Sequence, residues 1–201
     1  MISVKDMITR IRAETHDHQK AGFPDEELLL YINDALRFAR RTIMDIYPMM
    51  LVDIDMEGEL GDSENAIYPF KPISHIIDMR IDGERIDQVN PREIQKLNQT
   101  GKPKGYYLAG LECVKVWPVC DKPHEYSLLA IGDMEPLSID SEIPLPNDFD
   151  DFVYEYAMIR MAMTNEFDLS QESQVMSSVT NQITKMLYSY TSPGVQTKGY
   201  W

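Results

Sequence analysis

The segment from Phe23 to Pro48 places the strongest constraint on the fold of this chain. It reads FPDEELLLYINDALRFARRTIMDIYP, and its apolar residues recur at alternating spacings of three and four, which is typical of a helix with one buried side. Pro24 suits a first helical turn, and Pro48 stops the helix behind Tyr47. A helix of about 22 residues is roughly 33 Å long, so we expect other helices to cover its apolar side. That side consists of Leu29, Ile32, Leu36, Ala39, Ile43 and Ile46.

Three further segments carry helical signals, one near the start of the chain and two near its end. Ser3 and Asp6 have the spacing of a capping box, which predicts a short first helix. Asn147 or Asp148 is the predicted cap of a third helix, and Asp168 is that of a fourth. The apolar faces predicted for these helices are Val4, Met7, Ile8 and Ile11; Phe152, Tyr156, Ile159 and Met163; and Met176, Val179, Ile183, Leu187 and Tyr190.

The middle of the chain has the period of β-strands instead. Apolar and polar residues alternate over residues 52–57 and 77–82, and Asp82-Gly83 is a typical two-residue hairpin turn. We expect the first strands to form an antiparallel meander. Cys113 and Cys120 would lie about 23 Å apart along an extended strand, so free thiols are expected. The remaining strands are expected at residues 66–70, 85–89, 106–108, 113–117 and 126–131.

Helical signals at both ends and strand signals between them predict an α+β protein. We expect a helical bundle built from both chain ends with an inserted antiparallel β domain, because neither pair of helices has enough apolar surface to make a core alone. The predicted bundle comprises residues 1–48 and 147–190, and the predicted β domain comprises residues 49–146. Residues 191–201 are predicted to be a flexible C-terminal tail.

The charge of the chain restricts its partners. There are 33 acidic residues against 19 basic ones, and the resulting net charge of -14 disfavours a DNA-binding groove lined with Lys and Arg. The N-terminal segment has charges where a signal peptide needs an apolar core, and the longest apolar run is too short to cross a bilayer. We therefore expect a soluble cytoplasmic product with no membrane partner.

The sequence carries no recognisable catalytic signature. It lacks a Gly-rich phosphate loop, a Gly-x-Ser-x-Gly motif and a cysteine cluster with zinc spacing. His16 and His18 lie in a polar loop, where a solvated turn is favoured over a metal site. Most carboxylates fall at helix N-termini or on the outward face of a strand, and structural roles explain them. We predict no enzyme activity and no cofactor or metal, and a cell-wall hydrolase with an acidic pair is the alternative.

A basic cluster on the long helix is a candidate for binding another protein. Arg37, Arg40 and Arg41 lie away from the apolar side of this helix. One interpretation is that they form a subunit interface with an acidic surface. Intrahelical pairs with Asp34 and Asp45 are the alternative, and they are favoured because these residues lie three or four positions away.

The C-terminal segment is a second candidate. From Thr191 onward the sequence is rich in helix breakers, yet it ends in Tyr200 and Trp201. A segment that cannot fold by itself but ends in two large aromatic side chains is suited to docking in a pocket of another chain. A frayed terminus is the alternative. The residues assigned to this anchor are Pro193, Gly194, Val195, Tyr200 and Trp201.

Five segments, taken in order, match one known group of proteins. They are the short opening helix, FPDEELLLYINDALRFARR, IDGERIDQVNPREIQKL, GYYLAG with VKVWPV, and IPLPNDFDDFVYEYAMIRMAM. With these segments the chain resembles the head-to-tail adaptor, or connector, proteins of tailed bacteriophages, the group that includes tail tubular protein A of podoviruses. Members of this group look like helical bundles with a β insert.

The resemblance implies a structural virion protein that assembles in the host cytoplasm and lies at the neck between capsid and tail. Copies would form a ring, usually of about twelve, joining the portal protein to a tail nozzle or tail tube protein. It also implies that the C-terminal tail docks on the portal. An acidic ring would let genomic DNA pass without specific binding. A monomeric acidic binding module is the competing hypothesis that involves neither a ring nor catalysis.

Overall fold

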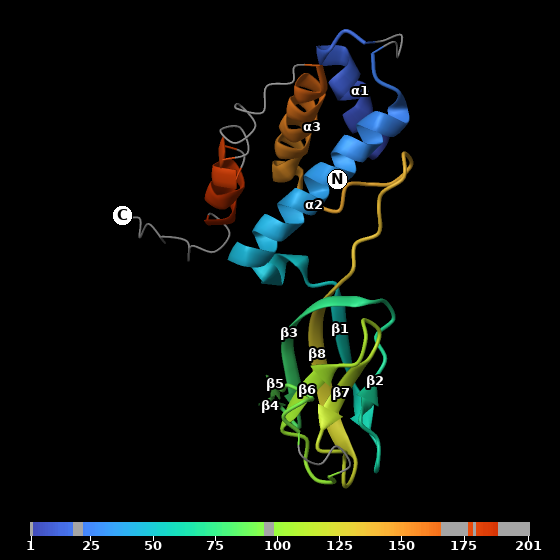
Figure 1. The fold of residues 1–201 in the computed structure, drawn as a ribbon, viewed down its shortest axis with the longest axis vertical. Helices are drawn as coiled ribbons and strands as arrows, with labels where there is room; N and C mark the ends of the chain where they lie inside the picture. The colour runs from blue at the N-terminus through green and yellow to red at the C-terminus, as the bar shows by residue number, and fades with distance from the viewer. Residues whose placement is uncertain (1, 18–21, 95–98, 166–176, 179, 189–201) are drawn as a thin grey trace, which may run out of the picture. The chain divides into compact units, whose positions relative to one another are not determined.

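The computed structural model describes residues 2–17, 22–94, 99–165, 177–178 and 180–188. Contacts between Cα atoms divide the chain into two compact units (Figure 1). Unit 1 comprises Met1–Tyr47 and Glu135–Trp201 and is called the helical unit below, whereas unit 2 comprises Pro48–Met134 and is called the sheet unit. The chain is therefore a mixed α+β protein, as predicted.

The first helix, α1 (Val4–Glu14), begins as the sequence predicts. The Ser3 side chain accepts a hydrogen bond from the backbone N–H of Asp6 at 3.0 Å, which satisfies one of the free donors of the first turn. All four predicted apolar residues of α1 are buried. The capping box and the apolar spacing together were therefore sufficient to define this helix.

The second helix, α2 (Asp25–Ile46), has the predicted limits but a wider buried side than predicted. Pro24 precedes its first turn, and Pro48 begins the short 3-10 helix η1 (Pro48–Leu51). Leu29 and Ile46, at the two ends of the predicted stripe, are only half-buried. The buried residues of α2 are Leu28, Tyr31, Ile32, Asn33, Ala35, Leu36, Ala39 and Ile43.

Helix α3 (Asp150–Asn165) covers part of α2, and the two lie side by side in Figure 1. The Phe38 ring of α2 packs on Phe152 and Tyr156 of α3, with ring centroids 6.3 and 5.7 Å apart. The predicted cap of α3 by Asn147 or Asp148 is wrong, because both residues lie within the 3-10 turn η2 (Asn147–Phe149), which precedes α3.

Residues 180–188 are also helical, with Ile183 and Leu187 buried as the predicted stripe requires. The predicted cap of this helix at Asp168 lies outside the described residues.

Segments from the two ends of the chain meet within the helical unit. The Val4 N–H donates to Ser141 O and the Ile143 N–H donates to Ile2 O, both at 3.0 Å. Arg10 of α1 pairs with Asp151 of α3 at 2.8 Å. These contacts place residues 135–146 with the helices, whereas the sequence analysis grouped them with the strands.

A buried arginine ties the end of α1 to the start of α2. The guanidinium of Arg12 donates to Asp17 Oδ2 at 2.7 Å, to Asp25 Oδ1 at 2.6 Å and to Phe23 O at 2.8 Å. Arg12 is only 6% exposed. Because an arginine has five donors in a fixed fork, one side chain can hold three separate acceptors in place.

The sheet unit contains two four-stranded sheets. One has the order β1-β8-β3-β4 and the other the order β2-β7-β6-β5. Their apolar inner faces form one core, so the sheets pack as a sandwich. The strands are β1 (Ile54–Leu60), β2 (Ala66–Ile67), β3 (Ile73–Ile81), β4 (Glu84–Arg85), β5 (Asp87–Gln88), β6 (Gly105–Leu108), β7 (Val114–Trp117) and β8 (His124–Gly132).

The predicted antiparallel meander is wrong. Strand β8, from the end of the unit, lies between β1 and β3, and it pairs with β1 from Ile54↔Ala130 to Leu60↔His124. The long apolar β8 buries more surface in the middle of a sheet than at its edge, and sequence spacing alone does not reveal such a distant partner. Most pairs are antiparallel, but β5 and β6 are parallel.

The hairpin turn at Asp82-Gly83 is confirmed, since Ile81 pairs with Glu84 and both turn residues have positive φ. The core face of β3 differs from the prediction. A register shift between Ile76 and Asp78 buries Ile76 and leaves Ile77 half-buried, because a bulge reverses the alternation of side chains. Cys113 and Cys120 are buried and free, as predicted.

Candidate interaction surfaces

The outer face of the β1-β8-β3-β4 sheet is acidic along β1. Since side chains alternate across a strand, the buried Ile54 and Leu60 place the odd-numbered residues between them on the opposite, solvent-facing side. Glu125 continues this charge onto β8, directly opposite Glu59. We call the four exposed carboxylates the acidic edge: Asp55, Glu57, Glu59 and Glu125.

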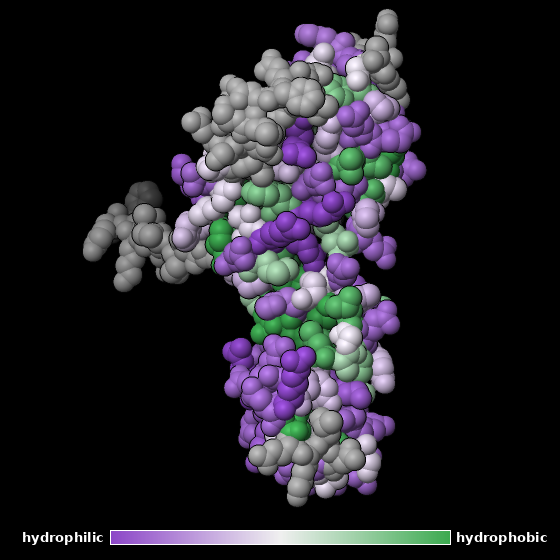
Figure 2. Space-filling view, in the orientation of Figure 1, coloured by the Kyte–Doolittle hydropathy of each residue, from purple (hydrophilic) through white to green (hydrophobic). Residues whose placement is uncertain are grey.

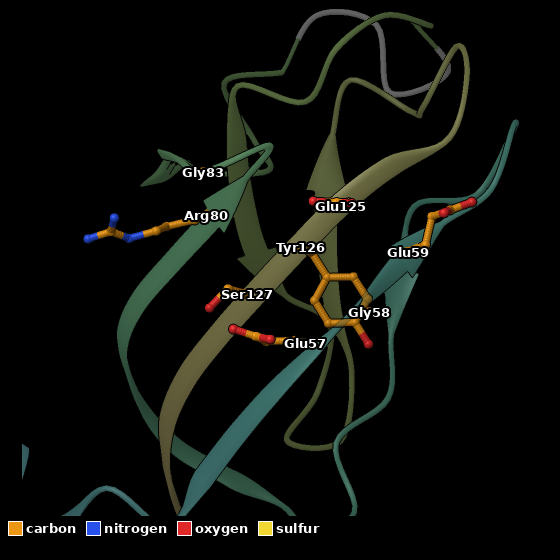
Figure 3. Close-up of a pocket in the computed structure, with 8 residues that line it drawn as sticks. All are labelled: Glu57, Gly58, Glu59, Arg80, Gly83, Glu125, Tyr126 and Ser127. Carbon is orange, nitrogen blue, oxygen red and sulfur yellow. The ribbon is translucent and has the colours of Figure 1, made fainter.

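A hollow of about 570 Å³ lies on this sheet between β1 and the β3–β4 turn (Figure 3). Glu57, Glu59 and Glu125 contribute to its lining, as does Arg80. In Figure 3 the Arg80 side chain points away from these glutamates. The hollow therefore carries an excess of negative charge.

Two arginines lie near the other edge of the same sheet, and we call them the arginine edge. Arg80 on β3 is directly opposite Arg85 on β4. Asp78 pairs with both, at 2.6 Å from Arg80 Nε and 3.4 Å from Arg85 Nε. The arginine side chains stay 52% and 68% exposed. Like charges opposite each other are unfavourable, and one shared carboxylate leaves this edge with a net positive charge.

Gly58 and Tyr126 also line the hollow, and they face each other across β1 and β8. A Cβ atom at Gly58 would lie 2.8 Å from the Tyr126 ring and hydroxyl. The ring therefore covers the glycine backbone, and a larger residue at this position would displace it.

A buried histidine holds the turn beside the hollow. His124 Nδ1 lies 2.7 Å from Asp82 Oδ2, and its Nε2 lies 3.2 Å from Asp121 Oδ1. The hydrogen bond with His124 holds the pKa of Asp82 below its ordinary value. Asp82 Oδ1 also accepts from the Glu125 N–H at 3.1 Å, so this cluster fixes the β3–β4 turn against β8.

Three large hydrophobic side chains on the loops of the sheet unit are exposed. Tyr68 and Phe70 are each 70% exposed, and Leu111 is 61% exposed. The Leu111 carbonyl accepts from Ile73 N–H at 2.7 Å, so the β6–β7 loop lies beside the start of β3. Figure 2 shows green hydrophobic areas on this unit among mostly hydrophilic residues. The sequence analysis placed Phe70 in a strand, but β2 ends at Ile67.

The predicted arginine cluster lies on α2, in the helical unit. Arg37 pairs with Asp34 at 2.8 Å, and its side chain remains 48% exposed. Arg41 is exposed, and Arg40 is half-buried. The intrahelical pair expected for Arg37 is therefore present.

A comparison with protein-family models identifies the family. The model described as "SU10 adaptor protein" matches residues 2–195, nearly the whole chain. The chain belongs to the SU10 adaptor protein family. This is a family of bacteriophage head-to-tail adaptor proteins, which agrees with the resemblance found in the sequence. No curated protein matches the chain.

SU10 adaptor proteins are structural proteins of the phage virion, and the family is not enzymatic. Among the residues described, no group of three or more His, Cys, Asp or Glu side chains is placed to hold a metal ion. Within the same residues, none of the helices has both the length and the apolar composition needed to cross a bilayer.

The sequence analysis identified some of these surfaces and missed others. The residues predicted to anchor the tail, Pro193, Gly194, Val195, Tyr200 and Trp201, lie outside the described part of the chain. The outward-facing carboxylates of β1 were identified from the sequence, but the arginine edge was not. Arg80 and Arg85 are separated by a hairpin, and the confirmed Asp82-Gly83 turn was the available signal that they face each other.

Proposed function

We propose that this SU10 adaptor protein forms a ring that joins the phage portal to the tail and continues the channel for DNA. The family match over residues 2–195 carries the proposal, because it covers both units rather than one. The partners are the portal protein, a tail nozzle or tail tube protein, and further copies of this chain, about twelve in a closed ring.

The helical unit is proposed to be a bundle built from both chain ends. The contacts of residues 2–4 with residues 141–143, and of α1 with α3, support this arrangement. The sheet unit is then an insert between α2 and α3. The exposed side of α2, with Arg37, Arg40 and Arg41, is a proposed contact for an acidic surface of a neighbouring copy.

The charge of the chain supports passage of DNA without specific binding. A net charge of -14 repels phosphates, and a channel wall that makes few phosphate contacts lacks the electrostatic term that dominates DNA affinity. A ring of acidic copies therefore lets the genome slide.

The C-terminal tail is proposed to dock on the portal. Removing residues 195–201 should leave a folded chain, as judged by circular dichroism, that no longer cosediments with portal rings. A control with Gln196→Ala and Thr197→Ala keeps both aromatic residues and should bind as the full chain does. Normal portal binding by the truncated chain would refute tail docking.

A further inference from the structure

A ring of identical copies needs two different, complementary surfaces on each copy. Each copy of this chain also carries a net charge of -14, so neighbouring copies repel unless opposite charges meet at their contact. This inference rests on the proposed ring and concerns which surfaces form its lateral contact.

The solvent-facing side of the β1-β8-β3-β4 sheet has the required asymmetry. Carboxylates follow the outer strand β1, and the guanidinium groups of Arg80 and Arg85 lie at β3 and the outer strand β4. The remaining charge of β4, Glu84, pairs with Lys102 at 2.7 Å. The acidic edge has four exposed carboxylates, and no ion pair within the described residues involves Asp55, Glu57, Glu59 or Glu125. The arginine edge has two exposed guanidinium groups that share Asp78. Both sets of side chains project from the same solvent-facing side of the sheet.

We propose that the arginine edge of one copy docks against the acidic edge of the next copy, with Arg85 near the hollow lined by Glu57, Glu59 and Glu125. A second copy fits this surface because the two edges lie on opposite sides of one sheet. In a ring, the arginine edge of each copy can therefore meet the acidic edge of the next copy in a head-to-tail contact. Arg85 is suited to the contact because it is the more exposed arginine and lies farther from Asp78, at 3.4 Å against 2.6 Å for Arg80. Glutamates in the hollow give it the carboxylate partners that its own edge lacks.

Cysteine pairs test the contact directly. One chain carries Glu59→Cys on β1 and a second carries Arg80→Cys on β3, directly opposite Arg85 and on the same side of the sheet, while Glu57 and Arg85 are unchanged. The native cysteines are at most 8% exposed, so background cross-linking is low. When both chains are bound to portal rings and oxidised with copper phenanthroline, we expect disulfide dimers that contain one chain of each kind. Absence of these mixed dimers would overturn the proposal.

Charge reversal tests the chemistry of the same contact. Adding Glu57→Arg to the first chain should lower the yield of mixed dimers by about fivefold or more, because the new positive charge then faces Arg85 of the neighbouring copy. Adding Arg85→Glu to the second chain should restore the yield. If the double reversal cross-links no better than the single one, opposite-charge pairing is refuted.

Matched controls move the same charges elsewhere on the sheet unit. Asp62→Arg in the first chain and Arg92→Glu in the second should leave the yield unchanged, since both residues are exposed and outside the two edges. An equal loss of mixed dimers with these controls would overturn the proposal.

Cosedimentation of the unmodified chain with portal rings is measured first. Failure there refutes the proposed function, whereas binding without mixed dimers refutes only this lateral contact.

Discussion

Replacing Arg12 with Met should destabilise the helical unit strongly. The change keeps a long apolar side chain but removes every hydrogen bond to Asp17, Asp25 and the Phe23 carbonyl. The carboxylates of Asp17 and Asp25 then lose the guanidinium that binds both of them. We expect the loop to open and the first turn of α2 to lose its link to α1.

The size of the expected loss in stability follows from the burial of the Arg12, Asp17 and Asp25 side chains. The Arg12 side chain is 8% exposed, and those of Asp17 and Asp25 are 13% and 23% exposed. Breaking a buried ion pair by removing one partner costs about 3–5 kcal/mol, and partial access of water to the carboxylates favours the lower end. We therefore expect a loss of about 3 kcal/mol in the free energy of unfolding. Arg12→Lys should lose about half of this stability, because lysine keeps the positive charge but lacks the planar guanidinium that binds three acceptors.

Urea unfolding followed by circular dichroism at a helix wavelength measures these losses. The matched control is Arg10→Met on the same helix. Its partner Asp151 is 76% exposed, and Arg10 also lies 4.3 Å from the centre of the Tyr154 ring. Exposed contacts of this kind contribute less than about 1 kcal/mol. Equal losses for Arg10→Met and Arg12→Met would refute the reasoning that burial makes the Arg12 contacts decisive.

Two further predictions concern the sheet unit. Gly58→Ala places a Cβ 2.8 Å from the Tyr126 ring, so urea unfolding should show a loss of about 1–2 kcal/mol in the free energy of unfolding. This loss should be smaller when Tyr126 is also changed to Leu. An unchanged unfolding midpoint for Gly58→Ala would contradict the prediction. Since His124 lowers the folded-state pKa of Asp82, the stability that Asp82 contributes is present above its unfolded pKa and is lost as pH falls through the folded value. The advantage of the wild type over Asp82→Asn in the free energy of unfolding should therefore shrink as the pH falls below about 4, and a difference that stays constant there would refute this prediction.

Local signals in the sequence predicted local structure well. The Ser3–Asp6 capping box, the prolines around α2 and the Asp82-Gly83 turn each act over a few residues, and the structure contains all of them. Strand pairing was predicted poorly, because the partner of β1 is some 70 residues away and no local pattern specifies it. The bulge in β3 is likewise decided by packing across the sheet, so Ile77 looked like a core residue.

The candidate surfaces were only partly predictable. Outward-facing carboxylates on β1 follow from alternation, and the Arg37–Asp34 pair follows from helical spacing. The role of Arg12 did not follow, because its partners come from the loop after α1 and from the start of α2. Its position beside the apolar face of α1 was the only hint, and a surface arginine fits that pattern equally well.

The most direct test of the central claim is the mass of the complex formed when the full chain is mixed with purified portal rings. Native mass spectrometry or mass photometry reports how many copies each ring holds. We expect one dominant species with a full ring of copies, about twelve, on each portal. A chain that leaves the portal mass unchanged, or that binds as a single copy, would contradict the proposed ring.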